Sequence, residues 1–132
     1  EEGIKGKEVE CAVLGNEEPK ASCIGEVLSA EDFYTFDSKY HNQESKTQIP
    51  ANLPKEISEE IRKIAIKAFE SVNGEGLARV DFFVEEGTNK IILNEINTMP
   101  GFTQISMYPQ LWEQSGIKYS KLLDKLIELA NK

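Results

Sequence analysis

Two apolar segments joined by a short polar turn place the strongest constraint on the fold of this chain. The segments are "GLARVDFFV" (76–84) and "KIILNEIN" (90–97), and "EEGTN" (85–89) lies between them. Along the first segment apolar side chains recur at every second position, as they do in a strand that buries one face. A connection that contains glycine is typical of a β-hairpin. The sequence therefore predicts an antiparallel pair of strands here.

The pairing within this hairpin is expected to gather oxygen atoms on one face. Directly opposed residues of an antiparallel pair point to the same side of the sheet. If Asp81 lies opposite Glu95, then Arg79 lies opposite Asn97. A slip of one residue would put the two carboxylates on opposite faces.

The same pairing makes two further demands on the hairpin. It requires a three-residue turn at 87–89, and it puts Val84 opposite Ile92. The other face of the hairpin is then apolar, and its members are Ala78, Val80, Phe82, Val84, Ile92 and Ile96. This apolar face is sufficient to form the core, so the face with the carboxylates is left for another purpose.

Two facing carboxylates indicate a cation. Opposed residues have β-carbons roughly 4.5–5.5 Å apart, and like charges at that distance repel unless something neutralises them. Arg79 supplies part of the positive charge that would neutralise the two carboxylates. Oxygen ligands from Asp81, Glu95 and Asn97, without histidine or cysteine, suit Mg²⁺ or Mn²⁺ better than zinc. Mg²⁺ completes its shell with water and phosphate oxygens, so such a site implies a nucleotide. The open alternative is a solvated hairpin face, which shows the same alternation.

The remaining segments predict more strands and two covering helices. Residues 7–15 and 22–28 are expected to be strands, whereas 37–48 has no periodicity and indicates a long loop, either a functional lid or a surface excursion. A helix is expected to begin at Pro54 and to end at Asn73-Gly74. Its apolar positions are Ile57, Ile61, Ile64, Ala65, Ala68, Phe69 and Val72. A last helix is expected from Tyr119, with Leu122, Leu123, Leu126, Ile127 and Ala130 on one face. The fold class predicted is α+β, an antiparallel sheet covered by helices.

Composition excludes several classes of function. The chain has 132 residues, enough for one domain with a core. Its net charge of −8 disfavours a nucleic-acid partner. No apolar run approaches the ~20 residues that span a bilayer, and the first residues do not form a signal peptide. We therefore expect a cytoplasmic protein without a membrane partner, with Cys11 and Cys23 as free thiols. The absence of an initial methionine suggests a piece of a longer chain or a removed tag.

Four stretches carry a family resemblance. "LARVDFFV" and "NEINTMPGFTQISMYPQLWEQSG", with "GKEVECAVLG" and "FYTFDSKY" upstream, resemble the C-terminal part of D-alanine–D-alanine ligases, which are ATP-grasp enzymes. The resemblance implies that residues 1–132 are the ATP-grasp C-terminal subdomain, mainly antiparallel, and that the N-terminal and central domains are absent. It also implies a ligase that joins two D-alanines through D-alanyl phosphate for peptidoglycan precursors. The ligase would use ATP and two Mg²⁺ or Mn²⁺ ions. The fragment alone would be inactive. The complete protein could be a homodimer.

The resemblance also implies roles for the residues of the hairpin and the segment after it. Asp81, Glu95 and Asn97 resemble the metal ligands, with Glu95 shared between both ions. Arg79 resembles the arginine that stabilises the acyl-phosphate and the tetrahedral intermediate. Gly101 resembles the glycine whose backbone N–H contributes to an oxyanion hole. A site for the carboxylate of the second D-alanine is implied at Ser106 and the backbone of Met107.

The resemblance implies that residues nearer the N-terminus bind the nucleotide and close a loop over it. Glu8 resembles the acid that holds the ribose hydroxyls. Lys39 resembles a lysine that contacts phosphate, and Tyr40 the tyrosine that closes the loop. The adenine pocket would be lined at Glu1, Glu2, Ile4 and Phe33. Glu2 departs from the lysine that the family has at that position, so only a backbone contact is carried over there.

Alternatives stay open for the function and for single residues. The chain could belong to another carboxylate–amine ligase of the ATP-grasp fold, or to a module that binds without catalysis. The intact trio of Asp81, Glu95 and Asn97 disfavours a non-catalytic module. Glu8 could be a surface strand residue, and Ser106 could be a helix cap.

Overall fold

The centre of the fold is a five-stranded antiparallel sheet with the order β3-β2-β1-β4-β5. The structure is a computed structural model, and it describes residues 5–28 and 47–131. The strands are β1 (Gly6–Gly15), β2 (Lys20–Val27), β3 (Thr47–Gln48), β4 (Gly76–Glu85) and β5 (Ile91–Asn97). The predicted antiparallel sheet is confirmed. Thr47 and Gln48, however, were expected in a loop and form a short edge strand that pairs with Val27 and Glu26.

The helices are α2 (Lys55–Ser71), α3 (Met107–Gln114) and α4 (Tyr119–Ala130). α2 begins directly after Pro54, as predicted. It ends where Asn73 adopts a positive φ of 54°, and the Gly74 N–H then donates to the carbonyl of Phe69 at 2.9 Å. These contacts satisfy carbonyls that the last helical turn leaves open.

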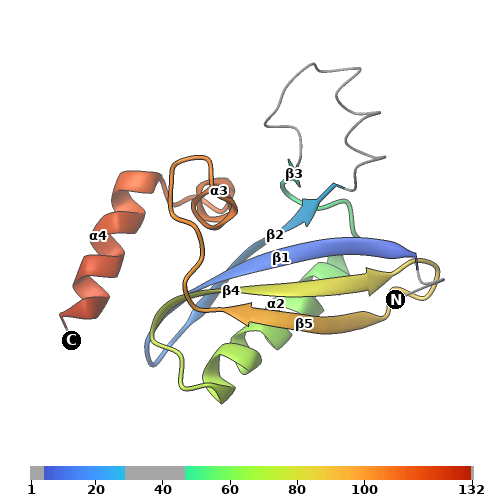
Figure 1. The fold of residues 1–132 in the computed structure, drawn as a ribbon, viewed down its shortest axis with the longest axis horizontal. Coiled ribbons are helices and arrows are strands. Elements are labelled where there is room, and N and C mark those ends of the chain that lie inside the picture. The colour runs from blue at the N-terminus through green and yellow to red at the C-terminus, as the bar shows by residue number, and fades with distance from the viewer. Residues whose placement is uncertain (1–4, 29–46, 132) are drawn as a thin grey trace.

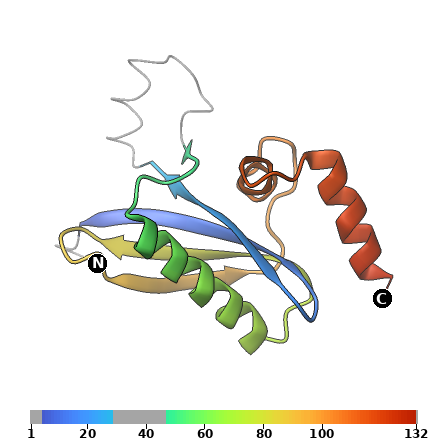
Figure 2. The same ribbon diagram turned by 180° about the vertical axis from the view of Figure 1, so that it is seen from behind.

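The elements form three layers (Figures 1 and 2). α2 runs along one face of the sheet, where Ile61, Ala65 and Phe69 pack against buried residues of the inner strands. α3 and α4 cover one end of the opposite face. α3 approaches β2 so closely that a β-carbon added to Gly25 would lie 2.7 Å from Leu111. Among the described residues, no helix covers the other end of this face, and the polar residues of the hairpin lie there.

The register of the β4–β5 hairpin is correct at its polar end and differs at its turn. Arg79 pairs with Asn97 and Asp81 with Glu95, as predicted. Asn94 is an extra residue without a partner on β4, so the strand contains a β-bulge. Beyond the bulge Val84 pairs with Ile91, not with Ile92 as predicted. The predicted three-residue turn was therefore wrong. The Glu85 N–H donates to the carbonyl of Lys90 at 2.9 Å, and the loop is longer than three residues.

The bulge changes which isoleucine joins the core. Ile91 and Ile96 pack against the core, whereas Ile92, expected there, is 36% exposed. Ile92 pairs with Phe83 and so lies on the face that carries Asp81. The face opposite α2 is therefore less polar near the turn than the sequence suggested.

Two helices bury less than their patterns predicted. Val72 was expected on the buried face of α2, but it lies at the C-cap and is 48% exposed. In α4 Leu122 is fully buried, whereas Leu123 and Ile127 are exposed at 39% and 62%. Within the described part of the chain, only part of the apolar face of α4 is therefore buried.

The two cysteines lie on neighbouring strands of the sheet, Cys11 on β1 and Cys23 on β2. Both cysteines are free, and burial raises the pKa of Cys11 to about 12. Cys11 thus behaves as a small core residue. None of the helices described within 5–28 and 47–131 has the length and apolar character that crossing a membrane requires.

Candidate functional site

The uncovered end of the sheet brings together polar side chains from three strands. On β1, Glu8 pairs with Phe83 and Glu10 pairs with Asp81. Asp81 in turn pairs with Glu95 on β5. Because paired residues point to the same side, one face carries an acidic row across β1, β4 and β5. The pairing that the sequence predicted for the hairpin is therefore extended by a third acid.

Arg79 is the cation at the centre of this acidic row. Its Nε lies 2.9 Å from Oδ1 of Asp81 and 3.2 Å from Oε1 of Glu10. Its Nη2 donates a second hydrogen bond to Oδ2 of Asp81 at 3.0 Å. The three side chains are only 20%, 14% and 15% exposed, for Arg79, Asp81 and Glu10 respectively. Partial burial makes these ion pairs stronger than exposed ones.

The local environment raises the pKa of two of these groups. The pKa of the Glu10 carboxyl is raised from its ordinary 4.5 to about 7, mainly because the group is buried and also because of the nearby charge of Asp81, and the charge of Arg79 opposes this rise. Hydrogen bonding to Asp81 raises the pKa of the Arg79 guanidinium, and burial opposes that change. Arg79 therefore stays charged, whereas Glu10 changes its charge near neutral pH.

The predicted metal ligands lie at the β5 side of the row. Glu95 is exposed and faces Asp81, and Asn97 faces Arg79. The Oδ1 atom of Asn97 accepts a hydrogen bond of 2.9 Å from the Met99 N–H, which fixes the amide at the end of the strand.

The oxygen atoms of Asp81, Glu95 and Asn97 are suitable ligands for a hard cation, although only two of the three residues are acidic. In the described residues, no three or more histidine, cysteine, aspartate or glutamate side chains are grouped so as to hold a metal ion. Mg²⁺ takes one or two protein carboxylates and fills its other positions with water and phosphate oxygens. Asp81 and Glu95 with the amide of Asn97 fit that requirement.

The segment between β5 and α3 brings Gly101 close to Ser106. A β-carbon added to Gly101 would lie 3.2 Å from the Oγ atom of Ser106. Ser106 occupies the N-cap position of α3, but its hydroxyl makes no cap hydrogen bond. It accepts a hydrogen bond of 3.0 Å from the Thr103 N–H instead. The alternative that Ser106 is only a helix cap is therefore not supported, and the first N–H groups of α3, beginning at Met107, keep the partial positive charge that attracts an anion.

A pocket of about 480 Å³ opens beside the acidic row. It is lined by Glu8, Val9, Glu10, Asp81, Phe82, Phe83, Ile92 and Asn94. Glu8, for which the family resemblance implies a ribose contact, lines this pocket and is exposed. Phe83 and Ile92 give the pocket an apolar side.

Three residues of this site were missed in the sequence. Glu10 belongs to a strand whose pairing with β4 spans some 70 residues, but its alternation with Val9 and Cys11 already indicated an outward side chain. Phe83 shares its face with Asp81 by simple alternation, and that signal was available. Ile92 could not be placed, because the bulge at Asn94 changes its face.

Six of the predicted residues lie outside the described part of the chain. They are Glu1, Glu2, Ile4, Phe33, Lys39 and Tyr40. Their roles remain predictions.

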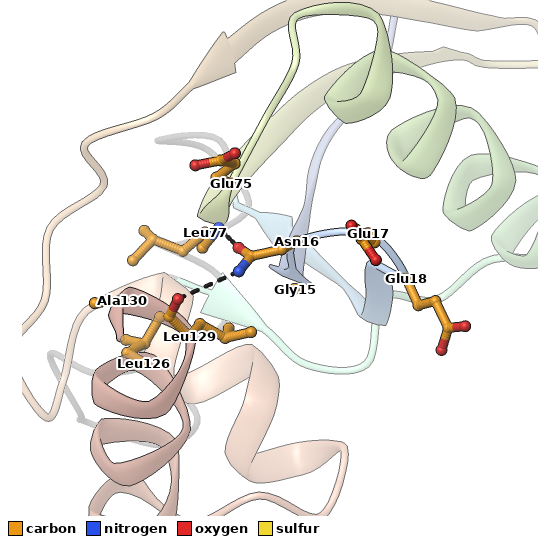
Figure 3. A pocket seen from close by; sticks show the side chains of 10 residues that line it. Gly15, Asn16, Glu17, Glu18, Glu75, Leu77, Leu126, Leu129 and Ala130 are labelled. Atoms are coloured by element: carbon orange, nitrogen blue, oxygen red, sulfur yellow. Dashed lines mark hydrogen bonds between the residues drawn. The ribbon is translucent and has the colours of Figure 1, made fainter. Parts of the chain in front are cut away.

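A larger cavity of about 810 Å³ lies elsewhere, between the β1–β2 turn, the start of β4 and the end of α4 (Figure 3). Asn16 spans it: its Oδ1 accepts from the Gly76 N–H at 2.8 Å, and its Nδ2 donates to the carbonyl of Leu129 at 3.3 Å. Its walls combine leucines with the exposed acids Glu17, Glu18 and Glu75. It contains none of the predicted site residues.

The sheet, its covering helices and the open acidic face define the C-terminal subdomain of an ATP-grasp protein. Two solved structures share this arrangement. The D-alanine-D-alanine ligase from Coxiella burnetii matches with a TM-score of 0.80 and 48% identity, over 98% of this chain and 33% of that one. A D-alanine–D-alanine ligase from Bacillus anthracis, solved in complex with ATP, matches with a TM-score of 0.77 and 30% identity, over 99% of this chain and 40% of that one.

The family itself follows from the sequence matches. The model of the family described as D-ala D-ala ligase C-terminus matches residues 1–128, so the chain belongs to this family. A D-alanine–D-alanine ligase of Acetivibrio thermocellus is 58% identical over 130 residues, which are 98% of this chain and 35% of that protein. The chain thus spans about a third of the length of that curated relative.

Proposed function

We propose that this chain is the C-terminal part of an ATP-dependent ligase that joins two D-alanines. The observation that carries the proposal is the pairing of Asp81 with Glu95 and of Arg79 with Asn97 on the uncovered sheet face, in a chain of this family. The complete protein would contain further domains, and the 132-residue chain alone would not form the dipeptide. The product would enter peptidoglycan precursors, and its synthesis would take place in the cytoplasm.

The reaction has two steps. The carboxylate of the first D-alanine attacks the γ-phosphorus of ATP, the bond to ADP breaks, and D-alanyl phosphate forms. The amine of the second D-alanine then attacks the acyl carbon, phosphate leaves, and the amine loses a proton. The protein contributes positioning and electrostatic stabilisation to both steps.

The nucleotide would occupy the pocket beside the acidic row. Phe83 and Ile92 offer an apolar surface to the adenine ring, and Glu8 at the rim accepts hydrogen bonds from the ribose hydroxyls. The phosphates would then lie along the row towards Asp81. Asp81, Glu95 and Asn97 would hold two Mg²⁺ or Mn²⁺ ions, with Glu95 shared between them. When bound, these ions neutralise charge on the phosphates.

The reacting groups would be held by Arg79 and by the segment before α3. Arg79 donates to the oxygens of the transferred phosphate and to the tetrahedral intermediate. The Gly101 N–H donates to the oxygen that becomes negative at the acyl carbon. Ser106 and the N–H of Met107 bind the carboxylate of the second D-alanine, because the start of a helix attracts anions. Lys39 would contact phosphate, and Tyr40 would be the tyrosine that closes the loop.

The test is an activity assay on the complete protein that contains this chain. We expect phosphate release that requires ATP, Mg²⁺ and D-alanine, with D-alanyl-D-alanine identified by mass spectrometry. L-alanine should not replace the substrate, and Asp81→Asn should abolish most turnover. ATP binding without phosphate release would favour a non-catalytic module. Phosphate release only with another amine would favour a different ligase of the same fold.

A further inference from the structure

The Nε atom of Arg79 lies between two carboxylates that have different positions in the site. It is 2.9 Å from Oδ1 of Asp81 and 3.2 Å from Oε1 of Glu10. Asp81 also accepts from Nη2 of Arg79, so both of its oxygens are engaged. In this structure the guanidinium therefore supplies the positive charge that Asp81 requires.

The carboxylate of Asp81 would also bind a cation, because Asp81 is a proposed metal ligand. A divalent cation bound to Asp81 withdraws negative charge from the carboxylate and repels the guanidinium. Arg79 and the cation thus compete for the same side chain. The Arg79 side chain is only 20% exposed, and a partly buried charge without a partner is costly. Arg79 needs another carboxylate when the cation is bound.

Glu10 is placed to be that carboxylate. It lies opposite Asp81 in the β1–β4 ladder, and its side chain is 15% exposed. The other neighbours of Arg79 across the sheet are Ala12, which has no polar side-chain atom, and Asn97, which carries no charge. Within the described residues, Glu10 and Asp81 are the acids that form ion pairs with Arg79.

We propose that Glu10 is a positioning residue for Arg79, which retains the guanidinium when a divalent cation takes Asp81. The inference rests on the proposed function. Arg79 then keeps its orientation towards the reacting phosphate throughout the reaction. In this role Glu10 influences the metal and the reacting groups only through Arg79.

The test measures Mn²⁺ binding by the complete protein, from the electron paramagnetic resonance signal of the free ion. We expect Glu10→Gln to weaken Mn²⁺ binding about tenfold, because Arg79 then loses the second partner of its partly buried ion pair and stays on Asp81. In the assay, kcat should fall while the KM for ATP changes little, because the positioned arginine acts on the reacting groups. Glu10→Asp, which retains the charge, should restore part of both losses.

A double-mutant cycle separates positioning from charge alone. In an Arg79→Met background there is no guanidinium to retain, so Glu10→Gln should weaken Mn²⁺ binding by less than about threefold. An equal loss in both backgrounds would mean that Glu10 acts on the metal directly, which would overturn the inference.

The matched control is Glu26→Gln. Glu26 is a buried glutamate on β2 whose carboxylate lies 3.9 Å from the Nζ of Lys7. It should leave Mn²⁺ binding unchanged, and thermal unfolding should show that each variant is folded. Mn²⁺ binding that Glu10→Gln and Glu10→Asp leave intact would overturn this inference alone. No Mn²⁺ binding by the unaltered protein would overturn the metal part of the proposed function and, with it, the inference.

Discussion

The hydroxyl of Tyr108 donates a hydrogen bond of 2.8 Å to the backbone carbonyl of Val13. Tyr108 is in the first turn of α3 and is 1% exposed, and Val13 is a buried residue of β1. The bond therefore fixes the start of α3 over the sheet. Because Ser106 and Met107 directly precede Tyr108, the same contact sets the position of the proposed acceptor site.

Two substitutions of Tyr108 should separate the contribution of the hydrogen bond to stability from the contribution of packing. We expect Tyr108→Phe to lower the free energy of unfolding by about 0.5–1.5 kcal/mol, the value of one hydrogen bond. Tyr108→Ala should cost about 3–5 kcal/mol, because it also leaves a cavity. Denaturant unfolding measures both. Equal losses for the two variants would show that packing at this position contributes nothing.

The metal assignment predicts an order among three variants of the complete protein. Glu95→Gln should reduce turnover more than Asn97→Ala, because a shared carboxylate neutralises cationic charge and an amide does not. Asp81→Asn should resemble Glu95→Gln. Turnover measured against Mg²⁺ concentration gives the comparison. Near-normal turnover of Glu95→Gln at ordinary Mg²⁺ would contradict the assignment.

The environment of Glu10 predicts an unusual titration in metal-free protein. Carboxyl carbon NMR should give Glu10 a pKa of about 7, above its ordinary 4.5. Asp81→Asn should lower this pKa, because the charge of Asp81 raises it, and Arg79→Met should raise it further.

The same shift has a defined sign for stability. Because folding raises the pKa of Glu10, its contribution to the free energy of unfolding is fully present below pH 4.5 and is lost as the pH rises through about 7. Glu10→Gln should remove this part of the pH dependence. An unchanged pH profile of unfolding in that variant would contradict the shifted pKa.

The contact between Gly101 and Ser106 predicts a coupling between two substitutions. In Gly101→Ala the new β-carbon would lie 3.2 Å from Oγ of Ser106, so the hydroxyl must move and its bond to Thr103 weakens. The cost should be within about 1–2 kcal/mol, as for other overpacked contacts. Adding Ser106→Ala removes the crowding, so the double variant should cost less than the sum of the single variants. Strict additivity in chemical unfolding would show that the two residues are not in contact.

Local patterns in the sequence were sufficient to place much of this protein. The alternation around "EEGTN" predicted the hairpin, and the pairing of Asp81 with Glu95 was the register that would put both carboxylates on one face. The 3.6-residue period after Pro54 gave α2 and its buried Ile61, Ala65 and Phe69. These features depend on neighbours close in the chain, so a sequence pattern contains them.

Other features depended on contacts between distant segments. The bulge at Asn94 moved Ile92 to the site face, and a longer turn compensated for the extra residue, so neither could be found by alternation alone. Glu10 met Arg79 only because β1 pairs with β4 across a large separation in sequence. The exposure of Ile127 reflects how little of the sheet α4 covers. The chemical types of the proposed ligands were thus determined by the sequence, whereas the third acid and the apolar wall of the pocket were decided by tertiary packing, because long-range pairing sets which side chains become neighbours.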